Sequence, residues 1–156
     1  MLITSLTYYK FKIMKKTIVL SLLFFSLYSQ AQNSEIQNTI ETFFEGFHTK
    51  DTVKLQMVCA DKIILQSIME GLKVNKLTNE TPKEFYNSVA TIPAEMKFEE
   101  KILSYSIQID GSMAHVWTPY AFYINGKFSH KGVNAFTLFK EKEVWKIIYL
   151  IDTRRK

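Results

Sequence analysis

Three apolar segments late in the chain decide its fold: AHVWTPYAFYI (114–124), KFSHKGVNAFTLFK (127–140) and VWKIIYLID (144–152). All three are rich in the aromatic and β-branched residues that favour strands. Asn125 and Gly126 separate the first two segments, and this dipeptide tolerates the positive φ of a two-residue hairpin turn. A short polar turn precedes the third segment. The pattern therefore predicts three strands in an antiparallel meander.

The turn at Asn125 also predicts which residues lie opposite one another. A two-residue turn pairs Tyr120 with Lys131, and closure of the next turn by Phe139 and Val144 pairs Lys131 with Asp152. Because side chains alternate along a strand, we expect Tyr120, Lys131 and Asp152 to form one polar row across the sheet. A one-residue bulge in either strand would change these pairs. The row is expected to be flanked by Thr118, Val133 and Leu150.

The opposite face of the same strands is expected to be strongly aromatic. Alternation places the following residues on it: Trp117, Pro119, Tyr123, His130, Phe136, Trp145, Ile147 and Tyr149. A lone monomer does not leave an aromatic patch of this size in water. We therefore expect this convex face to be covered.

The start of the chain has the organisation of a signal peptide. Residues 1–31 combine four lysines, an apolar run over 18–28 and a stretch of small and polar residues that ends at Ala31. We expect cleavage after Ala31, export to the periplasm or the extracellular space, and one mature domain over 32–156. The apolar run is about half of the roughly 20 residues that a spanning helix needs, so no membrane anchor is expected after cleavage. Met14 offers an alternative start.

The charge of the mature part gives no support to nucleic-acid binding, and the cysteine content excludes an intrachain disulfide. The chain has 20 basic and 15 acidic residues, but four lysines and no acidic residues precede residue 32. The mature part therefore has 16 basic residues and a net charge near +1, which gives no reason to expect nucleic-acid binding. Cys59 is the single cysteine, so no intrachain disulfide can form, and we expect it to pack as a small hydrophobic residue.

The first half of the chain reads as mostly helical. Apolar residues at helical spacing predict a helix over 34–47, a second short helix is expected over 51–58, and 61–68 has the composition of a strand. Thr81 opens a capping-box sequence that predicts a third helix to about Ile92. Residues 98–109 are expected to form one strand. The order of helices and strands indicates an α+β fold.

This order resembles the nuclear transport factor two-like superfamily, a cone-shaped α+β fold that includes SnoaL-like polyketide cyclases and ketosteroid isomerase. The resemblance covers residues 33–153. It implies a curved, mixed and largely antiparallel sheet packed on three N-terminal helices. Its motifs are a K-D-x-x-x-L-x-x-x-x-A-D segment over 50–61 and the W-K-I-I strand over 145–148. The segments F-S-H-x-G (128–132) and W-K-I-I-Y-L-I-D-T-R (145–154) are also similar to an exported, lumazine-binding-like branch.

The resemblance implies a ligand pocket on the concave face and a homodimer through the convex face. The residues expected to line the pocket are Phe43, Phe44, Phe47, Phe85, Thr118, Tyr120, Phe122, Lys131, Val133, Ile148, Leu150 and Asp152. The residues expected at the dimer face are Trp117, Tyr123, Phe136, Trp145, Ile147 and Tyr149. Alignment with ketosteroid isomerase places its catalytic base, tyrosine and oxyanion-hole aspartate on Ser67, Phe43 and Ala135. All three chemical groups are missing, so this activity is not expected.

Two functional hypotheses follow. In the first, the pocket binds a small, partly apolar molecule without transforming it. In the second, it is the active site of a lyase, isomerase or hydrolase in which Lys131 or Asp152 transfers a proton; the same two residues could instead form a structural salt bridge. No catalytic residue is assigned and no cofactor is expected. His48, His115 and His130 lack metal-ligand spacing, so no metal site is expected either.

Overall fold

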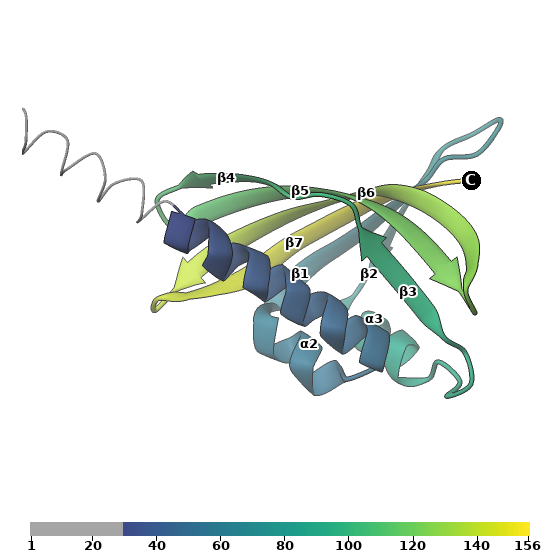
Figure 1. Cartoon of the computed structure of the whole chain (residues 1–156), viewed down its shortest axis with the longest axis horizontal. Helices are drawn as coiled ribbons and strands as arrows, with labels where there is room; N and C mark the ends of the chain where they lie inside the picture. Colours follow the sequence, from purple (N-terminus) through teal and green to yellow (C-terminus); the bar gives the residue numbers. More distant parts are fainter. Residues whose placement is uncertain (1–29) are drawn as a thin grey trace, which may run out of the picture. The chain divides into compact units, whose positions relative to one another are not determined.

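One curved, mixed sheet organises residues 36–156 of this computed structural model (Figure 1). The order of its neighbouring strands is β2-β1-β7-β6-β5-β3, and β4 also pairs with β5. All neighbours are antiparallel except β1 and β7, which are parallel. The strands are β1 (Cys59–Met69), β2 (Lys76–Glu80), β3 (Phe98–Ile102), β4 (Ser106–Asp110), β5 (Met113–Ile124), β6 (Lys127–Glu141) and β7 (Val144–Arg155).

The structure describes residues 30–156, so the expected signal peptide, with its alternative start at Met14, lies almost wholly outside the described residues. The first described helix covers 30–49, and α2 (Thr52–Val58) and α3 (Pro82–Ala90) follow it. The helices of the unit lie on one face of the sheet, which we call the inner face (Figure 1). Within 30–156, no helix has both the length and the apolar character that crossing a bilayer requires.

Local sequence signals account for the helix ends. Asp51 caps α2 by accepting a hydrogen bond from the Lys54 backbone N–H at 3.0 Å. The Thr81 hydroxyl accepts from the Glu84 N–H, the Glu84 carboxylate accepts from the Thr81 N–H, and Pro82 occupies the first turn. The capping-box prediction for α3 is therefore confirmed.

The structure differs from the predictions in two places before β5, where one strand is divided and another was not predicted. Residues 98–109 form two strands, β3 and β4, which pair with different parts of β5. Sequence patterns also gave no indication of β2, whose five residues are all exposed. An exposed strand at the sheet edge has no buried face, so it shows none of the apolar alternation by which strands are recognised.

The hydrophobic core lies between the inner face and the first helix. Ile36, Ile40 and Phe43 from the helix are buried together with Val116 of β5 and Leu138 of β6. The core also contains three residues that were expected on the convex face: Phe136, Trp145 and Ile147. Their placement at a dimer face is therefore wrong.

A β-bulge in β6 explains why Phe136 was placed on the wrong face. Asn125 and Gly126 form the expected turn with positive φ, and Tyr123 pairs with Phe128 as predicted. A register shift follows, which leaves Ser129 unpaired. Beyond it, Tyr120 pairs with Gly132 rather than with Lys131, and every later side chain of β6 points to the opposite face from the one predicted.

The second turn and a second bulge shift β7 as well. The turn is formed by Lys142 and Glu143, both at positive φ, so Glu141 rather than Phe139 pairs with Val144. A further register shift leaves Ile148 unpaired. Asp152 consequently pairs with Asn134.

The predicted polar row is replaced by another. The pairings between β5, β6, β7, β1 and β2 join a polar row on the inner face: Thr118, Asn134, Asp152, Ser67 and Thr78. Lys131 and Val133 lie on the outer face and His130 on the inner face, each opposite to its predicted side. Ala135, which the alignment placed in the pocket, also faces outward beside Trp117 and Ile151.

Gly132 lets Tyr120 cover the inner face of β6. A Cβ atom built on Gly132 would lie 1.7 Å from the Thr153 carbonyl oxygen and 2.9 Å from Cε1 of Tyr120. The carbonyl belongs to the backbone, so a larger residue displaces either β7 or the tyrosine ring. Glycine at this position is therefore a packing requirement.

We predict that Gly132→Ala lowers the free energy of unfolding by about 3 kcal/mol or more, because the clash involves backbone atoms. Lys131→Ala, one residue away on the exposed face, is expected to change it by less than about 0.5 kcal/mol. Urea denaturation of both variants measures the difference. Equal stability of the two variants would contradict the packing role of Gly132.

Candidate functional site

A cavity of about 420 Å³ opens between the helices and the inner face of the sheet. The first helix and α3 provide its phenylalanine wall, and all but one of its polar residues come from β1, β2, β3, β6 and β7, since Glu84 belongs to α3. Its lining consists of Phe43, Phe44, Phe47, Leu65, Gln66, Ser67, Met69, Thr78, Asn79, Glu80, Glu84, Phe85, Glu100, Asn134, Leu150, Asp152 and Arg154.

Phenylalanine rings form the apolar wall. Phe43 and Phe47 are four residues apart and lie on one side of the first helix, with ring centroids 6.5 Å apart. Phe85 of α3 stacks on both, at 6.1 Å from Phe43 and 6.3 Å from Phe47. Phe44 meets Phe43 edge to face at 5.4 Å. These mutual contacts hold a flat aromatic surface against the cavity.

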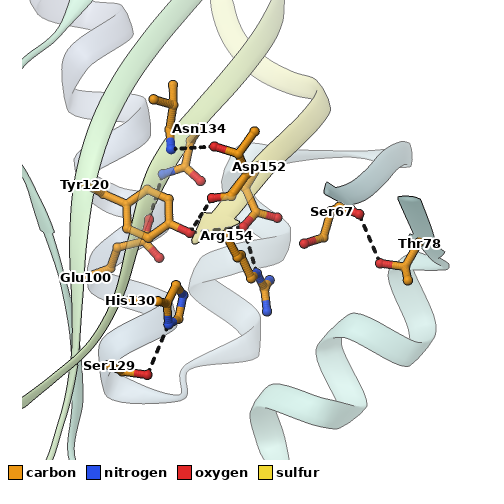
Figure 2. Close-up of polar contacts among 11 residues, drawn as sticks. Ser67, Thr78, Glu100, Tyr120, Ser129, His130, Asn134, Asp152 and Arg154 are labelled. Atoms are coloured by element: carbon orange, nitrogen blue, oxygen red, sulfur yellow. Dashed lines mark hydrogen bonds and ion pairs between the residues drawn. The ribbon is translucent and has the colours of Figure 1, made fainter. Parts of the chain in front are cut away.

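Tyr120, Asp152 and Arg154 form a hydrogen-bonded group at the sheet side of the cavity (Figure 2). The Tyr120 hydroxyl lies 3.2 Å from Oδ2 of Asp152 and donates to the Thr153 carbonyl at 2.9 Å. Arg154 Nε donates to the same Oδ2 at 2.7 Å. Burial, together with the negative charge of Asp152, raises the pKa of Tyr120 far above its usual value, so the hydroxyl stays protonated. Asp152 is thus held between a tyrosine donor and an arginine.

Glu100 enters the same region from β3. Asn134 Nδ2 donates to its Oε1 at 2.6 Å (Figure 2). Burial and, to a smaller extent, the negative charge of Asp152 raise the pKa of the Glu100 carboxyl to about 7, although the Asn134 hydrogen bond and Arg154 act in the opposite direction. Glu100 therefore exchanges its proton near neutral pH, which suits a group that transfers protons.

Glu100 was not among the residues predicted from sequence, although a signal was present. In FEEKI (98–102) the apolar residues Phe98 and Ile102 alternate with exposed ones, and Glu100 lies in phase with the apolar pair. A carboxylate at an inward position of a strand costs free energy unless it has partners or accepts a proton. Such a residue is a candidate for a functional site.

Two histidines border this group. Nε2 of His48 accepts the Glu100 backbone N–H at 2.9 Å, so this nitrogen carries no proton. Burial lowers the pKa of His48, while Glu99 opposes the shift. His130 stacks on Phe122 at 4.8 Å, and its pKa is also lowered, first by burial and then by Arg154. Both imidazoles are consequently neutral at neutral pH.

Half of the twelve predicted pocket residues line the cavity, and the other half lie elsewhere. Six of them line the cavity: Phe43, Phe44, Phe47, Phe85, Leu150 and Asp152. Tyr120 and Thr118 are buried on the inner face, and the Thr118 hydroxyl has no hydrogen-bond partner among the described residues. Phe122 stacks between Phe98 and His130. Lys131 and Val133 face outward, and Ile148 lies at the bulge.

Other chemical groups are less suited to reaction. Burial raises the pKa of the Cys59 thiol to about 11, so it is not a ready nucleophile. Within residues 30–156, no three histidine, cysteine, aspartate or glutamate side chains are grouped in a way that could hold a metal ion.

Solved structures resemble this chain over most of its length. An NTF2-like protein of unknown function from Shewanella baltica has 16% identity and a TM-score of 0.59, covering 81% of this chain and 95% of that one. A candidate dehydratase of the NTF2-like family from Streptomyces avermitilis has 14% identity and a TM-score of 0.64, with coverages of 82% and 99%. The beta subunit of a candidate aromatic-ring-hydroxylating dioxygenase from Novosphingobium aromaticivorans has 10% identity and a TM-score of 0.67, with coverages of 82% and 92%.

The chain therefore has the nuclear transport factor 2-like (NTF2-like) fold, as the sequence resemblance implied. No protein-family model and no curated protein matches it. Identities of this size show the fold alone, and structures with this fold include proteins named as enzymes. The activity has to be argued from the cavity.

The raised pKa of Glu100 predicts a pH dependence of stability. Its folded value of about 7 lies above its ordinary value of 4.5, so the folded state binds this proton more tightly. The stabilisation is complete below about pH 4.5 and is lost as the pH rises through 7. We expect the free energy of unfolding of the wild type, relative to Glu100→Gln, to fall by at most about 3 kcal/mol over this range.

Urea denaturation at a series of pH values measures this difference. The glutamine keeps an oxygen that accepts from Asn134, and the contributions of His48 and His130 are common to both proteins and largely cancel. Parallel stability curves for the two proteins would show that Glu100 titrates at its ordinary pKa.

Proposed function

We propose that this chain is an exported protein that binds a small, partly apolar molecule in the cavity on its inner face. One observation carries the proposal: the phenylalanine wall is met from the sheet side by a compact set of polar groups that includes Glu100, Asn134, Asp152 and Arg154. Ligand sites are concave, mostly apolar and contain a few convergent polar groups, and about 420 Å³ lies within their usual range of size.

The cavity favours a flat ligand with a polar or anionic end. Phe43, Phe47 and Phe85 offer stacked ring faces to an aromatic or conjugated body. Arg154 uses Nε for Asp152, and its two terminal nitrogens make no hydrogen bond to cavity residues among those described. These nitrogens are available to donate to a carboxylate or carbonyl oxygen.

The F-S-H-x-G segment supports the finer assignment to the lumazine-binding-like branch. Its polar and small residues each have a structural role, since Ser129 is the bulge residue, His130 points inward onto Phe122, and Gly132 accommodates Tyr120. We propose that this chain belongs to that branch and that the motif sets the register in which Asn134 faces inward beside Asp152.

Proton transfer by Glu100 is the second candidate function, in a lyase, isomerase or hydrolase. Its pKa of about 7 favours this role, since the carboxyl can both accept and donate a proton near neutral pH. Asp152 is better placed to orient Arg154 than to transfer a proton, because its Oδ2 accepts the hydrogen bond from Arg154 Nε at 2.7 Å. Lys131 has no part in either function, since it is exposed on the outer face.

Native mass spectrometry of the protein purified from its own host tests the proposal. We expect a chain that begins at Gln32, with a bound small molecule that Ser67→Phe displaces by filling the cavity. Ile68→Phe adds the same ring to the other face of β1 and is expected to retain the ligand. Ligand retained by both variants would place the binding site elsewhere, and a chain that still carries residues 1–31 would contradict export.

Glu100→Gln distinguishes the two functions once the ligand is known. A binding protein keeps its ligand chemically unchanged, and the variant alters only its affinity. An enzyme turns the ligand over, and the variant lowers kcat by about a hundredfold or more while binding persists. Absence of turnover by the wild type would remove the enzyme hypothesis.

We further propose a homodimer through the outer face of the sheet. Three of the residues expected there do lie on this face: Trp117, Tyr123 and Tyr149. Trp117, Ala135 and Ile151 form an uncharged row across β5, β6 and β7, and the Trp117 side chain is 48% exposed. An aromatic residue left this exposed beside aliphatic neighbours is typical of an interface.

Light scattering at micromolar concentration is expected to report a dimer. Trp117→Glu should weaken it by about thirtyfold or more, because each protomer then buries a charge at the interface. Leu103→Glu makes the same kind of change at an exposed residue that follows β3 and should leave the dimer intact. A monomeric wild type would refute the proposal.

A further inference from the structure

The hairpin between β1 and β2 presents apolar side chains to solvent. Leu72 at its tip is fully exposed and Val74 is 77% exposed. Met69 and Leu77, at the adjoining ends of the two strands, are each more than half exposed. Loop tips ordinarily carry small or polar residues. Four exposed apolar side chains within nine residues therefore suggest that the tip enters an apolar environment.

Cations surround this tip. Lys73 lies between the two apolar loop residues and Lys76 opens β2. The parallel pairing of β1 with β7 brings the end of the chain to the same place: Glu70 N–H donates to the Arg154 carbonyl at 2.9 Å, and Arg155 lies 3.4 Å from the Glu70 carboxylate. Figure 1 shows the hairpin beside the end of β7.

The charge of this region is unbalanced. Glu70 is the one acidic residue between β1 and β2, and Arg155 neutralises it. Lys73, Lys76 and Lys156 form no ion pair with any residue in 30–156. An apolar tip ringed by unpaired lysines matches the interface of a bilayer, where lysine ammonium groups lie at the headgroups and apolar side chains lie below them.

A groove of about 790 Å³ lies beside the tip and shares lining residues with the cavity on the inner face. Leu72 and His130 line this groove, and Met69 and Arg154 line both the groove and the cavity. A membrane or protein surface in contact with the hairpin would therefore lie close to the cavity on the inner face.

We propose that the β1–β2 hairpin docks this protein on a membrane surface that carries anionic lipid headgroups. Leu72 and Val74 enter the apolar boundary of the bilayer, and Lys73, Lys76 and Lys156 contact the headgroups. A protein partner fits the observations less well, because lysine is depleted from protein interfaces, whereas lysines near an anionic bilayer each contribute to binding. The proposal stands on the hairpin alone and holds whether or not the cavity binds a ligand.

A fluorescent label at Val74 tests insertion directly in the full chain. Val74→Cys is labelled with nitrobenzoxadiazole and mixed with vesicles made of equal parts phosphatidylglycerol and phosphatidylcholine. The native Cys59 is 4% exposed and remains unlabelled. We expect the emission to shift to the blue on these vesicles and to remain unchanged on pure phosphatidylcholine. Val53→Cys on α2, similarly exposed at 68%, is the matched control and should show no shift.

Charge substitutions test the lysines. Lys73→Gln combined with Lys76→Gln should lower partition of the Val74 label onto the anionic vesicles by about thirtyfold. Lys62→Gln combined with Lys127→Gln removes two exposed charges elsewhere and should have little effect on it.

Three outcomes would overturn the proposal. The first is water-like emission from the Val74 label on anionic vesicles, even if the chain binds them through other residues. The second is an equal shift on both vesicle types, which would show apolar adsorption without recognition of charge. The third is a shift that depends on protein concentration and needs no vesicles, which would assign the hairpin to self-association.

Discussion

The fit of the Tyr120 ring over Gly132 is the contact on which the rest of the structure depends. No other residue leaves room for the ring between β6 and the Thr153 carbonyl, and the tyrosine hydroxyl bonds to that carbonyl and lies 3.2 Å from Asp152 Oδ2. This pairing requires the unpaired Ser129, because a regular hairpin would place Lys131 opposite Tyr120. With Gly132 in place, Asn134 of β6, and then Asp152 and Arg154 of β7, face the helices.

The carboxyl groups of Asp152 and Glu100 lie in the same region but have different surroundings. Asp152 accepts from Arg154 and lies within reach of the Tyr120 hydroxyl, so its charge is matched. Glu100 is buried and lies in the field of Asp152, and these two effects raise its pKa to about 7 although Asn134 donates a hydrogen bond to it. The cavity thus contains one carboxyl that is paired with a cation and another that exchanges its proton near neutral pH, which are the groups on which the two proposed functions depend. The phenylalanine wall keeps this region apolar, and electrostatic interactions are stronger in apolar surroundings than in water.

Much of the fold could be predicted from local sequence. The Thr81 capping box, the Asp51 cap and the Asn125-Gly126 turn depend on neighbouring residues only, and all three occur. The strand register could not be derived in this way. A β-bulge involves a single residue, but it changes the pairing of all the residues beyond it in two strands. The cavity was predicted in part: the phenylalanines and Asp152 were found from spacing and resemblance, whereas Glu100 was overlooked because its strand was merged with the next. Lys131 was assigned to the cavity by the same one-residue error that put Phe136 on the surface.

The sequence by itself determined the α+β class, the N-terminal caps of α2 and α3 and the meander of the last three strands, because each follows from propensity and from residues within a few positions of one another. The tertiary structure alone decided which face of β6 and of the first part of β7 meets the helices, and thereby that Asn134 rather than Lys131 faces inward beside Asp152. The physical reason is that strand alternation has a period of two, so a single unpaired residue reverses every side chain beyond it. Contacts between residues far apart in the sequence, such as the packing of Tyr120 on Gly132 and the burial of Phe136, favour the observed outcome.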